Sequence, residues 1–111
     1  MTGAAKRKGD KAERECAELI ATLIGGNVKR ALGAGRAEDT GDIYGVPDTA
    51  IQVANWADLA NAVRTKPGEA EQQRVNAGAT FAATFCRIRG GRWVVAMTPE
   101  QWATYHRGAM S

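Results

Sequence analysis

The chain has few of the residues that build metal or disulfide centres. Its 111 residues include two cysteines and one histidine. Cys16 and Cys86 lie in apolar stretches, with no Cys-x-x-Cys spacing and no histidine nearby, which argues against a zinc site and predicts two reduced core cysteines in a cytosolic protein. His106 has no partner visible in the sequence, so we interpret it as a surface or packing residue.

The chain also lacks a long apolar segment. No run of it approaches the roughly 18 residues that a membrane span needs, and no hydrophobic stretch of signal-peptide length follows the basic N-terminus. We therefore expect a cytoplasmic protein with no membrane partner, in the host cytoplasm if a phage encodes it. With 111 residues that are 44% hydrophobic, the chain can fold as one domain around one core and has no room for a second.

The spacing of apolar and turn residues predicts the order of the elements. Residues 1–9 are expected to form a basic flexible arm, after which a helix begins at Asp10 and ends at Gly25. We predict strands at 27–31, 42–44, 49–55, 80–89 and 92–97, a flexible loop at 32–41, and helices at 56–63, at 67–77 and from Thr98 onward. Residues 10–111 should therefore form a single domain, an α/β sandwich with a central mixed five-stranded sheet.

The candidate site residues are acids and an amide that are far apart in the sequence. In the strand at 49–55, the period of two sends Gln52 and Ala54 to the same side. Each acid also has a purely structural interpretation, because Glu13 stands three residues after Asp10, as in a capping box, and Asp42 could cap a turn. Asp48 follows Pro47 inside a turn, and turn chemistry is its simplest explanation.

One motif resembles a known family. The run KGDKAERE from Lys8 to Glu15 resembles the KGxxAERE opening of archaeal-type Holliday junction resolvases, which belong to the PD-(D/E)XK nuclease superfamily. The resemblance implies a restriction-endonuclease-like α/β sandwich and a metal-dependent endonuclease that acts as a homodimer on branched DNA such as four-way junctions. It continues in order over nearly the full length, through Arg30, residues 41–43, residues 51–54, Ala77, Gly78 and the hairpin of Trp93.

By this resemblance, Glu13 and Asp42 correspond to two acids that hold the metal, and Gln52 and Ala54 stand where the family has its E-x-K pair. Clustered oxygens can hold Mg²⁺ or Mn²⁺, which activates water and neutralises charge on the phosphate. Gln52 keeps a carbonyl oxygen as a neutral ligand, but Ala54 cannot replace an ammonium group. Loss of one such group typically costs ~10²–10³-fold in rate. Lys66 is the first candidate to replace the missing lysine.

Basic residues are concentrated in the first third of the chain, around the candidate acids. With a net charge of +3, the composition favours a polyanionic partner without requiring one. Basic groups beside carboxylates suit the positioning of phosphates, although charged runs are usually just solvated surface. The predicted DNA-binding residues are Lys6, Arg7, Lys8, Lys11, Arg14, Lys29, Arg30 and Arg36.

Three functions remain open on the sequence. The first is a Mg²⁺-dependent endonuclease of the junction-resolvase type. The second is a catalytically impaired nuclease fold that binds structured DNA without cutting it, and the residues at Gln52 and Ala54 favour this alternative. The third is a basic protein-interaction domain, against which only the resemblance argues strongly.

Overall fold

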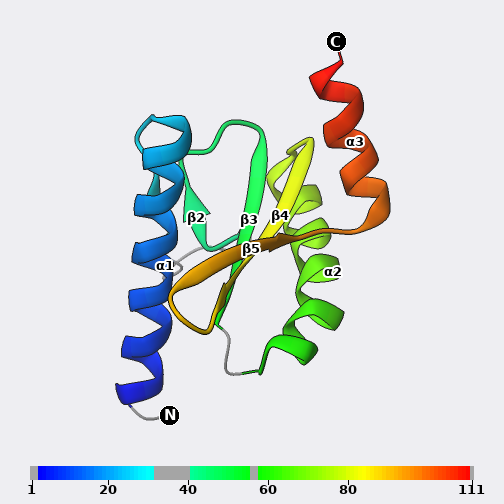
Figure 1. Cartoon of the computed structure of the whole chain (residues 1–111). Coiled ribbons are helices and arrows are strands. Elements are labelled where there is room, and N and C mark those ends of the chain that lie inside the picture. The colour runs from blue at the N-terminus through cyan, green and yellow to red at the C-terminus, as the bar shows by residue number, and fades with distance from the viewer. Residues whose placement is uncertain (1–2, 32–40, 56–57, 111) are drawn as a thin grey trace.

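The computed structural model describes residues 3–31, 41–55 and 58–110, and for residues 3–9 the backbone alone. Figure 1 shows the arrangement of these elements. None of the helices within these ranges is both long and apolar enough to cross a membrane. In chain order the elements are α1 (Gly3–Ile24), β1 (Lys29–Arg30), β2 (Ile43–Tyr44), β3 (Thr49–Asn55), α2 (Leu59–Ala77), β4 (Phe81–Ile88), β5 (Arg92–Ala96) and α3 (Pro99–Ala109).

The five strands form one mixed sheet in the order β1-β2-β3-β4-β5. The pairs β1/β2, β2/β3 and β4/β5 are antiparallel, and β3/β4 is parallel. Parallel neighbours need a long crossover connection, and α2 provides it between β3 and β4. The predicted α/β sandwich with a mixed five-stranded sheet is therefore confirmed.

The two long helices cover opposite faces of the sheet. Successive side chains of β3 point to opposite faces, so some pack against α1 and others against α2. Ile51 and Val53 pack toward α1, and Ala54 packs toward α2. The α1 side of the core consists of Cys16, Ala17, Ile20, Ile43 and Ile51, with partly buried Val28, Val46, Val53, Phe85 and Trp93 packed against them. The α2 side consists of Ala54, Ala62 and Cys86, with Leu59 and Ala96.

The structure corrects two of the predicted helix boundaries. First, α1 begins at Gly3, so most of the segment expected to be a flexible arm is helical and Asp10 lies inside the helix instead of capping it. Alanine, lysine and arginine, which are good helix formers, fill residues 4–8 and explain this extension. Second, the helices predicted at 56–63 and 67–77 are one helix, with Pro67 buried in its interior. Packing against β3 and β4 outweighs the hydrogen bond that this proline cannot donate.

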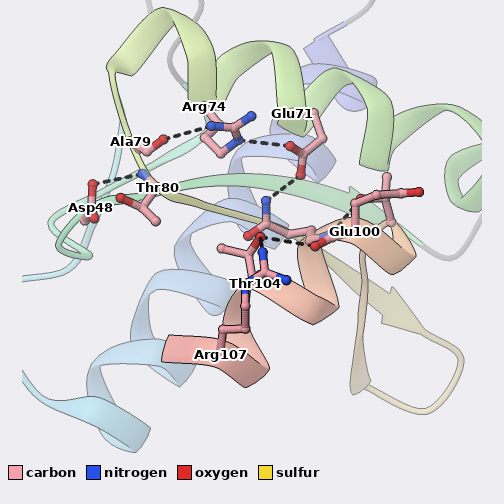
Figure 2. Close-up of polar contacts among 10 residues, drawn as sticks. Asp48, Glu71, Arg74, Ala79, Thr80, Glu100, Thr104 and Arg107 are labelled. Carbon is pink, nitrogen blue, oxygen red and sulfur yellow. Dashed lines mark hydrogen bonds and ion pairs between the residues drawn. The ribbon is translucent and has the colours of Figure 1, made fainter. Parts of the chain in front are cut away.

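The third helix closes the end of the sheet where β4 begins. The Thr98 hydroxyl caps it by accepting from the backbone N–H of Gln101, as the sequence predicts. Tyr105 packs against Phe81 of β4 with ring centroids 4.6 Å apart and ring planes tilted by 31°. The Gln101 amide donates to Glu71 of α2 at 2.7 Å, so α3 is joined to both the sheet and α2 (Figure 2).

Candidate functional site

Glu13, the first predicted acid, is held by an arginine from the sheet. The Arg30 guanidinium donates to Glu13 Oε1 at 3.1 Å and to Asp10 Oδ1 at 2.8 Å. All three side chains are about one-quarter exposed. Arg30, which the sequence assigned to phosphate binding, is therefore engaged with two carboxylates and ties α1 to the edge strand β1.

Asp42, the second predicted acid, lies immediately before β2. Its Oδ2 accepts from the backbone N–H of Val53 at 2.8 Å, and its own N–H donates to the Ile51 carbonyl at 2.7 Å. Val53 is the residue that separates Gln52 from Ala54. The Asp42 carboxylate is thus fixed beside residues 52–54 of β3.

Cys16 shows that the two acids lie in the same region of the molecule. Burial, followed by the negative charges of Asp42 and Glu13, raises the pKa of the Cys16 thiol to about 12. The contacts agree with this proximity, because Arg30, which holds Glu13, pairs with Ile43, the residue that follows Asp42. The predicted meeting of the α1 acid and the mid-chain acid on one metal ion stays a prediction.

Gln52 does not present a free amide to these acids, because its side chain is bonded to α2. Its Nε2 donates to Glu69 Oε1 at 3.0 Å, and its Oε1 accepts from Gln73 Nε2 at 2.8 Å. The residue is 5% exposed. The carbonyl oxygen that was expected to serve as a neutral metal ligand is engaged in a buried contact between β3 and α2.

Ala54, where the resemblance predicts a lysine, is part of the packed core. Ala54 is 6% exposed and lies in the apolar cluster with Ala62 and Cys86. Lys66, the predicted replacement, pairs with Glu69 at 3.2 Å, and the same Glu69 oxygen accepts from Gln52. A carboxylate and an ammonium group from α2 therefore lie next to Gln52. Sequence reasoning missed Glu69, although its spacing of three residues from Lys66 on a helix was a usable signal.

These residues do not fit a magnesium ion as they are arranged. Within residues 10–31, 41–55 and 58–110, no three acidic, histidine or cysteine side chains are gathered closely enough to hold a metal. Arg30 neutralises Glu13, and the Gln52 carbonyl is bonded to Gln73. Hard cations need several converging oxygens, and here one oxygen each of Glu13, Asp42 and Gln52 already accepts from a protein donor.

The predicted basic residues divide into three groups. Lys11, Arg14 and Lys29 have exposed side chains, as phosphate binding requires. Arg30 is committed to Asp10 and Glu13. The remaining predictions lie outside the described side chains, namely Lys6, Arg7, Lys8 and Arg36.

Further arginines, which the sequence did not single out, lie on the hairpin between β4 and β5. Arg87 donates to Glu15 of α1 at 2.7 Å, and Arg89 and Arg92 are exposed at the turn. Three arginines flank Gly90 and Gly91 in the sequence. This concentration of positive charge could have indicated a basic surface, but the glycine pair was interpreted only as a hairpin turn. A cavity of about 150 Å³ lies beside the ion pair of Arg87 with Glu15, and its lining residues are Lys11, Ala12, Glu15, Asn55 and Arg87.

Larger cavities in the described part of the protein lie away from the candidate acids. One of about 600 Å³ is bordered by Tyr44, Pro47 and Asn76. Another, of about 450 Å³, lies between α2 and α3, where Glu71 accepts from Arg74 and Gln101 (Figure 2). Neither cavity is lined by Glu13, Asp42 or Gln52.

Comparison with models of protein families, with curated proteins and with solved structures finds no match to this chain. Its function must therefore be argued from the residues and contacts described above.

Proposed function

We propose that this protein binds duplex or branched DNA with a nuclease-like fold and does not itself cut it. The observation that carries the proposal is the bonding of Gln52, whose amide oxygen and nitrogen are both taken up by α2. The residue next to it on the same face, Ala54, is buried in an apolar cluster. A carboxylate and an ammonium group are the groups that metal-dependent hydrolysis would need at these two positions.

DNA is the proposed partner because of the resemblance to junction resolvases and the charge of the surface. The side chains of Lys11, Arg14 and Lys29 are exposed, and among the described residues no ion pair like that of Arg30 is found for them. Lysine and arginine contacts to phosphates release counterions, which makes such binding strong at low salt and steeply salt-dependent. In this proposal the protein binds four-way junctions and other branched duplexes in preference to linear duplex DNA.

The test uses a labelled four-way junction and a linear duplex of the same sequence. Binding is measured as salt increases, and each DNA is then incubated with protein and Mg²⁺ or Mn²⁺. We expect salt-sensitive binding and no metal-dependent product. A product that forms with metal and is lost in Asp42→Ala contradicts the proposal, and absence of affinity for both DNAs at low salt removes DNA as the partner.

A metal-dependent endonuclease is the second candidate, and one contact favours it. Glu69 accepts from both Gln52 and Lys66, so α2 could supply the acid and the cation that β3 lacks. Its side chain is half exposed. If this alternative is correct, Lys66→Met and Glu69→Gln lower the cleavage rate far more than the affinity for DNA.

A matched pair on the same helix serves as the control for this second candidate. Arg74 and Glu71 form an ion pair of the same spacing at 2.9 Å, away from Gln52. Arg74→Met should therefore leave any cleavage rate unchanged. Equal losses of activity in Lys66→Met and Arg74→Met would show that both act through the stability of α2 and not through chemistry.

We further propose that the protein is a homodimer, as expected for a protein that acts on a DNA with two equivalent strands. Large apolar side chains support a second copy as partner, because Leu23 and Ile24 at the end of α1 are 69% and 62% exposed. They border an apolar cavity of about 170 Å³ that reaches Phe85 and Tyr105. Exposed apolar patches of this kind often mark interfaces. Sedimentation equilibrium of the native chain and of Leu23→Gln measures the oligomeric state directly.

A further inference from the structure

The two edge strands of the sheet differ in length, charge and cover. β1 has two residues, both of them basic, and packs against α1. β5, at the opposite edge, has five residues, of which only Arg92 is charged. Short length, charged side chains and a covering element each keep a sheet edge from pairing with another chain. β1 has all three of these features, so β5 is the edge that can accept a further strand.

The centre of β5 is exposed on both faces of the sheet. Of the described elements, β5 packs extensively only against β4, and none pairs with its outer edge (Figure 1). The register with β4 places Val95 on the same face as Phe85, which is the α1 face, and Val94 on the opposite face. Val94 and Val95 are each 46% exposed. The edge of β5 therefore combines backbone groups that can pair with apolar side chains on either face.

Apolar surface continues from β5 toward the end of α1. Phe85, the β4 partner of Val95, lines the apolar cavity of about 170 Å³ that Leu23 and Ile24 border. The apolar surface to which the second copy is assigned above therefore continues to the β5 edge.

The sequence of β5 suits antiparallel pairing with its own copy. A two-fold axis at Val94 places the two Val94 side chains opposite each other. In this register Trp93 lies opposite Val95 of the second copy, and Arg92 lies opposite Ala96 of the second copy. No like charges meet, and an aromatic side chain meets a β-branched one, a combination that stabilises paired strands. The strand is therefore complementary to itself.

We infer that a second copy of the chain pairs antiparallel with β5, so that the two sheets become one continuous sheet, an inference that rests on the homodimer proposed above. The two-fold axis of such a pair is perpendicular to the sheet, so both copies keep α1 on the same face. α1 carries the exposed side chains of Lys11 and Arg14. The dimer therefore presents two basic helices on one side, where a single branched DNA can contact both.

The experiment introduces like charges at the two-fold axis. In Val94→Lys two ammonium groups would meet across the paired strands, so we expect this variant to be monomeric where the native chain is dimeric. The control is Val63→Lys, because Val63 is a 48% exposed valine on α2, which does not pack extensively against β5. Sedimentation equilibrium measures the oligomeric state of each protein, and circular dichroism measures whether each is folded.

A cysteine variant tests the register without adding charge. Val94→Cys places two thiols opposite each other in the dimer, and a short bis-maleimide should link them covalently. Tyr44→Cys is the control, because Tyr44 is exposed on β2, which β3 and β4 separate from β5. Cys16 and Cys86 are buried, so the native chain should not be linked.

A folded, monomeric Val94→Lys beside a dimeric control, with cross-linking of Val94→Cys alone, supports the inference. A folded Val94→Lys that stays dimeric overturns it, as does a dimeric Val94→Cys that is not linked, and both results leave the proposed homodimer and DNA binding standing. If Val94→Lys does not fold, or if both lysine variants are monomeric, the cross-linking decides. A native chain that is monomeric at every concentration removes the inference and the homodimer together, while its binding to the four-way junction tests the proposed DNA binding separately.

Discussion

The Asp42 carboxylate accepts from the backbone N–H of Val53 at 2.8 Å, which joins the residue before β2 to the centre of β3. Gly41 makes this possible. It has a φ of 114°, and a Cβ added to it would lie 2.9 Å from the Ile51 carbonyl oxygen, which also accepts from Asp42 N–H. The position of Asp42 therefore depends on a glycine at the preceding residue.

We predict that Gly41→Ala displaces Asp42 and destabilises the protein. The side chain would collide with backbone in a conformation that disfavours it, and the expected loss is about 2–3 kcal/mol of unfolding free energy. Urea denaturation measures this loss. Gly68→Ala is the control, because Gly68 lies in α2 with open space around it. Equal stability of Gly41→Ala and the native chain would contradict the close approach.

The bonded pair Gln52 and Gln73 should behave as one unit. Gln52→Leu leaves the Gln73 amide, which is 2% exposed, without this acceptor. A buried polar group that loses its partner costs about 1–3 kcal/mol. The double variant Gln52→Leu/Gln73→Leu should lose less stability than the sum of the single variants, because both partners are then apolar. Strictly additive losses in urea denaturation would show that the contact contributes no coupling.

Cys16 makes the protein less stable in alkaline solution. The folded-state pKa of its thiol is raised from 9.0 to about 12, so above pH 9 the unfolded chain releases a proton that the folded chain keeps. Stability from this group is complete below pH 9 and declines as pH rises toward 12. Between pH 9 and pH 10 the expected decline is about 1 kcal/mol.

Unfolding free energies of the native chain and of Cys16→Ala, measured at pH 8 and pH 10, test this dependence. The variant starts less stable because it leaves a small cavity, but it should lose less stability between the two pH values. Cys16 should also resist thiol reagents at pH 8 until the chain unfolds, because the thiolate is the reactive form. An identical pH dependence in both proteins would exclude Cys16 as the source.

Arg30→Met should separate α1 from the edge strand. The guanidinium holds two carboxylates at one-quarter exposure. Its loss should therefore cost more than loss of an exposed partner, which costs little, and less than the ~3–5 kcal/mol for removing one partner of a fully buried pair. We expect a loss of about 1–2 kcal/mol in thermal or urea unfolding. Arg30→Lys should recover only part of it, because one ammonium group lacks the planar fork. The same substitution at exposed Arg14 should change stability by less than ~0.5 kcal/mol.

The strands and the last helix were predictable because their signals are local. Alternation in residues 49–55, the glycine pair at 90–91 and the Thr98 cap each depend on neighbouring residues only, and each is found in the structure. The helix boundaries were less predictable. Pro67 suggested an interruption, yet contacts of α2 with β3 and β4 hold the helix together through it.

In the candidate site, too, some features were predictable from the sequence and others depend on packing between elements. From the sequence alone came the order of the strands, the acids Glu13 and Asp42, and the absence of an acid and a lysine at Gln52 and Ala54. Only the tertiary structure decided what each side chain bonds to. Arg30 is paired with two acids, Gln52 is bonded to α2, and Arg87 of the hairpin is bonded to Glu15 of α1. Spacing along a chain determines which face a residue lies on, but its partner comes from another element and is chosen when those elements pack.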